Sequence, residues 1–396
     1  MRLRLAAVSA CLLVGVASAP GCLVEEVDLT GLACPCGDGW ACRCGVCVPE
    51  GEAGGDCPDE TPWASTSHGR RRALDVAAVT EDLQDLVVQV RLTPERLDPA
   101  LAGPTGEALR FFDATGRALA HEIDHWDPAG ASVVWVRLPE VPKAGMRFFV
   151  YYDDSMASDV ADAAATWEGY LAVWHLSPDL VDATGKGNGG TDLGTADEES
   201  PLGRARHFDQ ASAVDIGARP SLADVFQTGA TITAVIQPNG WGGGSFGRIL
   251  DKASGVAGEG GWSFQIANGG GVVESLRFER GFVDGSTSGW LGPANAVVLG
   301  SWQTVAVIYD EAGGAPLFFV DGASRGASSD GTGTGSFASD ALQPLLIGNH
   351  EDIRGFDGAI DELRIAAGPR SGAFMEADHR SIRDELLSYG AEETRP

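Results

Sequence analysis

The segment HEIDHWDP, residues 121–128, contains two residue patterns that could do chemistry. In the H-E-x-x-H pattern, His121 and His125 would bind zinc and Glu122 would be the general base of a hydrolase. In a carboxylate pattern, Glu122 would be the nucleophile of a glycoside hydrolase and a second acid would protonate the leaving group. The two hypotheses need different local structure, because the zinc pattern requires a helix and the carboxylate pattern requires a strand.

The zinc hypothesis fails on local structure. Histidines four positions apart share one face on a helix, whereas the segments that flank this motif have the pattern of strands. Asp127-Pro128 also ends the segment just past His125. A third ligand is missing, since Pro128 and Ala131 stand where the longer zinc-hydrolase pattern has Gly and His. We therefore expect no zinc-protease site here.

The carboxylate hypothesis fails on spacing. On a strand Glu122 and Asp124 share one face and Asp127 lies on the other, so two acids about 5 Å apart are not assembled by spacing alone. Elsewhere, Glu274 and Glu279 of ESLRFE also point to opposite faces of their strand. The sequence has no phosphate-binding P-loop. We therefore expect no catalytic residues.

Composition narrows the class of protein. The 396 residues include 56 acids and 28 bases, which gives a formal net charge of −28. This charge repels phosphate backbones and anionic lipid, so we expect no nucleic-acid partner. The 54 glycines, ten tryptophans and scarce helical periodicity indicate an all-β chain with many turns.

Residues 1–21 have the pattern of an export signal, with two arginines, a short apolar run and small residues. Cleavage could follow Ala17-Ser18-Ala19, or it could precede Cys22 of "APGC" with a lipid added to that cysteine. Pro20 is unfavourable directly after the first site, and Cys22 stands where bacterial lipoproteins carry the acylated cysteine. We expect lipidation of Cys22 and an exported outer-membrane lipoprotein, on the cell surface or the periplasmic face, that contacts the membrane only through its lipid.

A cysteine-rich segment follows at residues 22–60. Apart from Cys22 it contains Cys34, Cys36, Cys42, Cys44, Cys47 and Cys57. An even number of cysteines in an exported, glycine-rich stretch predicts three disulfides, whose pairing the sequence does not choose. The alternative is a zinc knuckle at Cys44-x-x-Cys47, which an oxidising compartment and the lack of a nearby histidine disfavour.

A linker at residues 61–69 leads to a β domain expected at 70–160. Strand patterns occur at 85–92, 132–139 and 146–152, and in VVWVRL the alternation predicts one buried face. The blocks RRALDV, EDLQDLVVQVRLTPERLD, LRFFDATGRALAHEIDHWDPAGASVVWVRLP and FFVYYDD resemble a bacterial domain family of unknown function that precedes laminin-G-like modules. That family usually shows E-I-E-x-W where this chain has EIDHW, residues 122–126, and its pattern does not include the two histidines.

A second β domain is expected at residues 161–390. Its first block YLAVWHLSPDLVDATGKGNGG, the middle block SWQTVAVIYDEAGGAPLFFVDGA and the last block IGNHEDIRGFDGAIDELRIAAGPRSGAFMEADHRSIRDELLSYG are similar to those of bacterial laminin-G-like, concanavalin A-like lectin modules. Alternating apolar residues with turn signals between them predict a two-sheet antiparallel jelly-roll sandwich.

An acid in the last strand of this sandwich suggests a metal. In GAIDELRI, Asp361 shares a face with Leu363 and therefore points inward, where a carboxylate needs a partner. First and last strands of such sandwiches are commonly neighbours, which would bring Asp209 close and make a calcium site. The alternative is a hydrogen-bonded carboxylate pair that involves Arg364 or Arg206.

Aromatic residues in glycine-rich loops suggest a ligand. Trp241 and Trp290 lie in such loops and could stack on a sugar, although packing over a sheet edge is the alternative. The sequence thus predicts a non-catalytic, lipid-anchored extracytoplasmic protein that binds a glycan or a cell-surface polymer through its laminin-G-like domain. A protein-binding adhesion or scaffold module and a glycoside hydrolase are the alternatives.

Overall fold

The computed structural model describes residues 39–43, 46–50, 61–252, 260–310, 314–331, 333, 335–349 and 354–395. The chain divides into two units, Met1–Asp59 and Glu60–Pro396. In the first unit, β1 (Trp40–Arg43) and β2 (Val46–Pro49) form an antiparallel hairpin in which Cys47 takes part in a disulfide. Cys22 and the other five cysteine side chains lie outside the described residues, so the lipid and the three-disulfide framework stay predictions.

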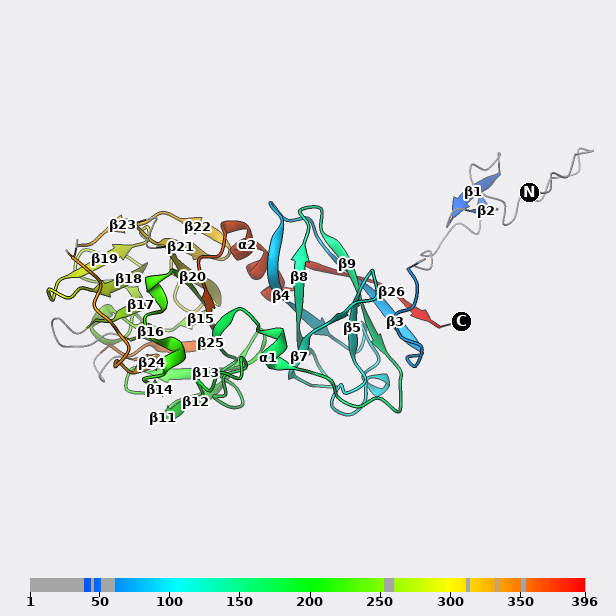
Figure 1. Ribbon diagram of the computed structural model, residues 1–396, viewed down its shortest axis with the longest axis horizontal. Helices are drawn as coiled ribbons and strands as arrows, with labels where there is room; N and C mark the ends of the chain where they lie inside the picture. Colours follow the sequence, from blue (N-terminus) through cyan, green and yellow to red (C-terminus); the bar gives the residue numbers. More distant parts are fainter. Residues whose placement is uncertain are drawn as a thin grey trace, which may run out of the picture. The chain divides into compact units, whose positions relative to one another are not determined.

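The second unit begins with a sandwich of two antiparallel sheets, here called the first sandwich (Figure 1). One sheet has the order β26 (Leu387–Thr394), β3 (Arg70–Val76), β9 (Met146–Tyr152), β5 (Arg110–Asp113) and β6 (Ala118–Leu119). The other has the order β4 (Leu83–Leu92), β8 (Ser132–Val141) and β7 (His121–His125), and a 3-10 turn, η2 (Pro99–Leu101), lies in a connection. Alternate residues such as Val88, Val136 and Val150 from both sheets fill the core between them.

The second sandwich consists of two eight-stranded sheets. The back sheet contains β12 (Ala196–Ser200), β13 (Gly203–Asp209), β25 (Asp357–Ala367), β15 (Ala230–Pro238), β20 (Gln303–Tyr309), β21 (Leu317–Val320) and β22 (Ala323–Arg325), with β10 (Tyr170–Trp174) paired to β25. The front sheet contains β11 (Thr191–Leu193), β14 (Ala213–Gly217), β24 (Leu345–Ile347), β16 (Arg248–Asp251), β17 (Trp262–Ala267), β18 (Ser275–Gly281), β19 (Thr287–Leu291) and β23 (Ser328–Ser329). Short 3-10 turns are η3 (Pro220–Leu222), η4 (Val225–Gln227) and η5 (Gly243–Ser245).

The predicted all-β class is confirmed, and inward-facing residues such as Ile232, Phe264 and Phe278 make the core of the second sandwich. Two α-helices occur in the described part of the chain, α1 (Ala163–Thr166) and α2 (Gly372–Ile382). The Ser371 hydroxyl accepts a hydrogen bond from the backbone N–H of Phe374 and so caps the start of α2. No helix among these residues is long and apolar enough to cross a membrane.

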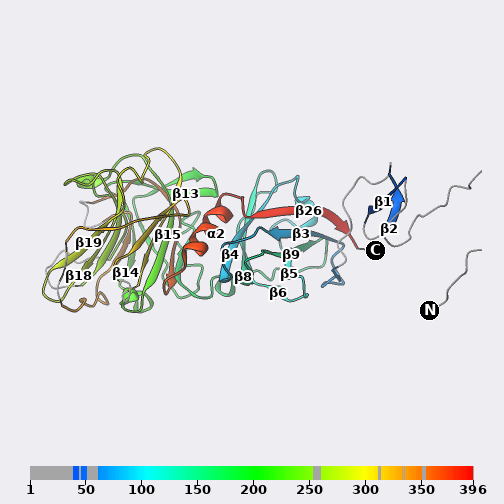
Figure 2. The same ribbon diagram turned by 90° about the horizontal axis from the view of Figure 1, so that it is seen from above.

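Helix α2 lies between the two sandwiches, as Figures 1 and 2 show from two directions. Its Phe374 and Met375 join the core of the first sandwich to Ile308 on the outer face of the back sheet. A second apolar cluster between the sandwiches contains Trp135 and Trp167. Strand β8 is therefore buried on both faces, whereas the alternation in VVWVRL predicted one buried face, because the second face packs against a different sandwich.

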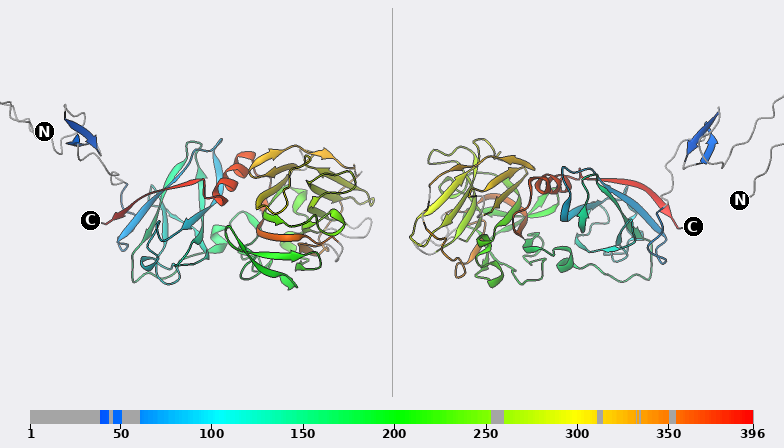
Figure 3. Two further views of the ribbon diagram at one scale, coloured as in Figure 1. Left: turned by 180° about the vertical axis from the view of Figure 1, so that it is seen from behind. Right: turned by 45° about the horizontal axis from the view of Figure 1, so that its top comes forward.

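The last strand corrects the expected end of the second domain. Residues 161–390 were expected to form that domain, but β26 pairs with β3, so its first residues belong to a sheet of the first sandwich. Both views in Figure 3 show the last strand of the chain, in red, running away from the second sandwich along the first. Arg71 is fully buried and forms an ion pair with Glu393 at 2.8 Å, which adds a charged contact to this pairing.

Candidate functional site

The HEIDH motif forms strand β7, as its flanking strands led us to expect. His121 is buried and its ring lies 5.0 Å from that of Phe111 in the core of the first sandwich. A register shift between Ile123 and His125 interrupts the pairing with β8. Because the segment is a strand, the two histidines do not have the helical geometry that a shared zinc ion requires.

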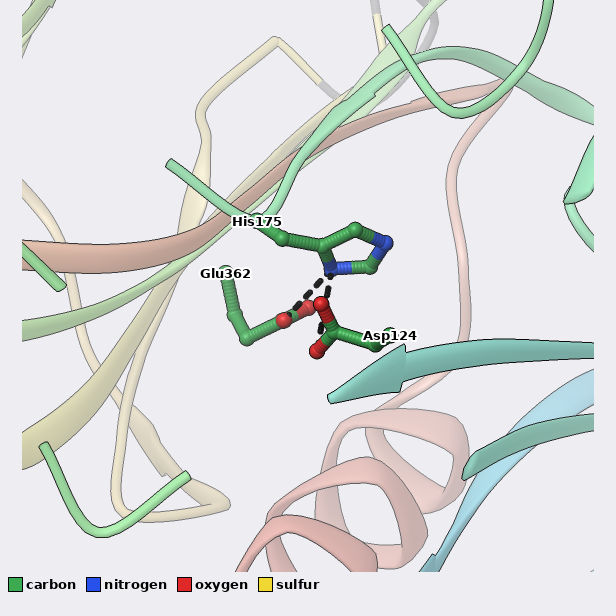
Figure 4. Close-up of side chains that lie close together, drawn as sticks. All are labelled: Asp124, His175 and Glu362. Carbon is green, nitrogen blue, oxygen red and sulfur yellow. Dashed lines mark hydrogen bonds and ion pairs between the residues drawn. The ribbon is translucent and has the colours of Figure 1, made fainter. Parts of the chain in front are cut away.

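The two carboxylates of the motif point instead toward the second sandwich. There they surround His175, which follows β10, together with Glu362 of β25. Figure 4 shows Asp124, His175 and Glu362 of this group. His175 Nδ1 lies 2.6 Å from Glu362 Oε1 and 3.8 Å from Asp124 Oδ2, and His175 Nε2 lies 3.1 Å from Glu122 Oε2. These four residues, here called the interdomain cluster, connect one strand of the first sandwich with two segments of the second.

Charge and burial determine the protonation of the interdomain cluster. Burial alone would lower the pKa of His175, but the neighbouring carboxylates, Asp124 first, raise it well above its usual value. Burial raises the pKa of Asp124 to about 7, with His175 opposing and Glu362 reinforcing the shift. Burial would also raise the pKa of Glu362, but the positive charges of His175 and Arg364 bring it below its usual value. A protonated His175 therefore faces an ionised Glu362.

Arg364 extends the cluster from β25 to helix α2. Its guanidinium donates to Glu362 Oε2 at 2.7 and 3.1 Å and to Asp378 Oδ1 at 2.9 Å. It also lies over the rings of Trp135 and Trp167, at 4.4 and 4.8 Å from their centroids. The Arg364 side chain is 1% exposed, so this network is an interior one.

The interdomain cluster offers ligand atoms for a metal in principle. One atom each from Asp124, His175 and Glu362 lies within 4.8 Å of the others, and no other such group occurs among the described residues. The 2.6 Å contact between His175 and Glu362 is a hydrogen bond, however, and is shorter than the separation of two ligand atoms around a tetrahedral zinc ion, about 3.3 Å from bond lengths near 2.0–2.1 Å. The geometry fits a hydrogen-bonded ion-pair network that joins the two sandwiches.

The structure does not bring the two predicted calcium ligands together. Asp209 pairs across the sheet with Asp357, four residues from Asp361 along β25, a distance of about 13 Å on a strand. Asp361 is buried and accepts a hydrogen bond from the Ser200 hydroxyl at 2.6 Å. Asp209 is exposed, and hydrogen bonds from Ser212 lower its pKa. The calcium hypothesis therefore loses the carboxylate pair on which it depended.

The two candidate tryptophans have different surroundings. Trp290 lies in strand β19 rather than in a loop, is 8% exposed, and packs against Phe278 and Tyr309. Its predicted ligand contact is corrected, because a ring enclosed by the core offers no face to a sugar. Trp241 is half-buried at the edge of the same core and stays a candidate.

A polar hollow of about 320 Å³ lies on the outer face of the front sheet. Its polar lining comes from Arg248, Gln265, Arg277, Glu279, Asp330 and Arg354. Strand alternation places these side chains there, because Trp262, Phe264 and Ile266 of β17 fill the core and Gln265 points outward between them. Figure 2 shows β18 and β19 of this sheet on the side away from the first sandwich.

Both acids of the polar hollow are paired with a cation. Arg277 donates to Asp330 Oδ2 at 2.8 and 2.9 Å and also forms an ion pair with Glu279. Gly289 allows this approach, since a Cβ there would meet the Asp330 carbonyl oxygen at 2.7 Å. Sequence reasoning rejected Glu279 as a catalytic partner of Glu274 and missed the hollow, because its lining comes from strands and loops more than 80 residues apart.

Two segments of the chain match known families, in the order expected from the sequence. Residues 105–175 match a domain of unknown function (DUF2341), and residues 208–373 match the concanavalin A-like lectin/glucanases superfamily. The resemblance to this domain combination is confirmed. The first match includes Glu122 and Asp124 and ends at His175, so three of the four residues of the interdomain cluster lie within it.

Similarity to solved structures involves about half of this chain. Domain 4 of AbnA, a GH43 extracellular arabinanase from Geobacillus stearothermophilus in complex with arabinotriose, is 17% identical, with 52% of this chain and 96% of that chain covered and a TM-score of 0.40. The Ruminococcus gnavus IT-sialidase CBM40 bound to alpha2,3 sialyllactose is 15% identical, with 46% and 98% covered and a TM-score of 0.35. The binding domain of Paraclostridial Mosquitocidal Protein 1 is 11% identical, with 54% of this chain and 52% of that chain covered and a TM-score of 0.43. The match therefore spans about half of that chain. The chain matches no curated protein.

Proposed function

We propose that this protein, with a concanavalin A-like segment at residues 208–373, is a non-catalytic binding protein that holds a saccharide or cell-surface polymer in the polar hollow of the front sheet. The proposal includes export and a lipid on Cys22, which the signal pattern of residues 1–21 supports. The first sandwich then acts as a rigid support, because helix α2 and the interdomain cluster fix the back sheet against it.

The observation that carries the proposal is the combination of a hollow with buried polar groups aimed into it. Gln265 is fully buried and its Oε1 atom accepts no hydrogen bond from a residue that the structure describes. A buried acceptor without a donor costs about 1–3 kcal/mol, which a ligand hydroxyl would recover. Volumes of 300–1,000 Å³ with a few convergent polar groups are typical of small-ligand sites.

The pairing of its acids supports a binding role over hydrolysis. Glycoside hydrolysis needs one carboxylic acid that can donate a proton and one free carboxylate. In the polar hollow, Glu279 and Asp330 both form ion pairs with Arg277, so neither is a free carboxylate. We therefore assign the hollow a binding role and no hydrolytic role.

A saccharide array and calorimetry with the full-length chain test this function. Gln265→Met keeps the side-chain length and removes the amide, so we expect saccharide binding about tenfold weaker, from the loss of about 1.4 kcal/mol. Gln227→Met, at an exposed position of the same sandwich, is the matched control and should bind as wild type. A wild type that binds no saccharide contradicts the proposal and favours the protein-binding alternative.

A further inference from the structure

We infer that the saccharide bound by the polar hollow carries a carboxylate and that Arg354 pairs with it. This inference rests on the proposed function, because it names the class of saccharide that the same site takes. The reason is that Arg354 is the one cation of the hollow without an ion-pair partner among the described residues.

The other two guanidinium groups are already neutralised. Arg277 is held by Glu279 and Asp330, and Arg248 lies 2.9 Å from Asp251. These two guanidinium groups face three carboxylates, so they do not call for an anionic ligand.

Arg354 differs from Arg248 and Arg277 because no carboxylate among the described residues neutralises its charge. An aromatic ring lies beside it instead. Its guanidinium carbon lies 4.8 Å from the centroid of the Phe246 ring, and it forms no hydrogen bond or ion pair with a described residue. The Arg277 guanidinium lies 5.7 Å from the same centroid. Phe246 thus orients guanidinium groups at the hollow, since cations are attracted to an aromatic face. A planar, oriented guanidinium binds a carboxylate through two parallel hydrogen bonds.

Gln265 adds a second contact of defined chemistry. Its Oε1 acceptor is buried and has no donor among the described residues, while its Nε2 donates to Glu279 at 3.3 Å. An anion alone cannot satisfy Oε1, because a carboxylate has no donor, but a sugar hydroxyl can. A ligand that offers both a carboxylate and hydroxyl groups, as a uronic or sialic acid does, matches both residues.

The test compares acidic saccharides with their neutral counterparts on the full-length chain. The probes are galacturonic acid oligomers, the same oligomers after reduction of their carboxyl groups, and a sialic acid glycoside with its desialylated form. We expect at least one acidic probe to bind tenfold or more tightly than its neutral counterpart, and the preferred acid identifies the source. Raising the salt concentration should weaken this binding.

Variants assign the preference to one residue. Arg354→Gln should lose the preference for the acidic probe, Arg354→Lys should keep part of it, and Arg117→Gln, at an exposed position, should keep all of it. Unchanged melting temperatures would show that the variants fold. Equal binding of acidic and neutral probes by wild type would overturn this inference and leave saccharide binding intact. Binding of neither would overturn both, and a preference that survives in Arg354→Gln would remove Arg354 from the site.

Discussion

Replacing Arg364 by methionine should destabilise the whole Glu60–Pro396 unit. Methionine keeps much of the apolar stem beneath Trp135 and Trp167 but removes the charge that Glu362 and Asp378 share. Breaking a buried ion pair by removing one partner costs about 3–5 kcal/mol, because the remaining carboxylates stay buried. We expect the whole range of about 3–5 kcal/mol to apply here, because Arg364 and Glu362 are each only 1% exposed.

The corresponding change in melting temperature follows from the size of the unit. An unfolding entropy of about 2.1 cal/mol/K per residue gives about 0.7 kcal/mol per degree for Glu60–Pro396. We therefore expect Arg364→Met to melt about 4–7 °C below wild type in differential scanning calorimetry at pH 7. Adding Glu362→Gln and Asp378→Asn to this variant should recover part of the loss, because both carboxylates are then neutral. Exposed Arg117→Met is the control.

A melting temperature of Arg364→Met within about 1 °C of wild type would refute the argument. It would mean that the two carboxylates find water or other donors once the guanidinium is gone. Two separate transitions, one of them unshifted, would instead refute the assumption that the two sandwiches unfold together.

Three further predictions concern other residues. Burial lowers the pKa of His121 to about 4, so the folded state resists its protonation and stability is lost as pH falls from about 6.5 to 4. The free energy of unfolding of wild type relative to His121→Gln, measured by urea unfolding, should fall by about 3 kcal/mol across that range. A difference that stays constant with pH would contradict the shift. Trp290→Ala should cost about 3–5 kcal/mol of stability and Trp241→Ala clearly less, since only Trp290 is enclosed by the core; equal thermal midpoints would contradict these placements. In a bacterial host, Cys22→Ser should prevent partition of the protein into detergent, and unchanged partition would exclude a lipid on this residue.

The strand pattern made much of the fold predictable, because burial on one face imposes a two-residue period that is local in sequence. Val134, Val136 and Leu138 follow that period and lie in the predicted core. Trp135 was not expected to be buried, since its partners Trp167 and Arg364 belong to segments that no local pattern connects to β8. Trp290 was misplaced because glycine on both sides suggested a loop, whereas Gly289 belongs to the paired strand β19 and Gly292 directly follows it.

The candidate sites were less predictable for the same reason. Glu122 and Asp124 attracted notice through a motif, but their partner His175 is 53 residues from Glu122, and Glu362 is 187 residues from His175. Asp361 is buried, but it does not share the predicted inward face: Ile360 and Leu363 fill the core, and a register shift in β25 places Asp361 on the other face. The register of β13 against β25 also places Asp357, and not Asp361, beside Asp209. Register between distant strands depends on the whole sheet, so sequence spacing alone did not determine it.

Because β26 pairs with β3, the order in which the chain is synthesised differs from the order in which its sheets can be completed. The strands of the second sandwich leave the ribosome before residues 387–394, so the five-stranded sheet lacks its edge strand throughout their synthesis. During that interval β3 exposes unpaired backbone groups, which are a template for pairing with other chains. The second sandwich is thus an insertion within the first, and cutting the chain between them would leave the first sandwich without its edge strand β26 and β26 without its partner β3.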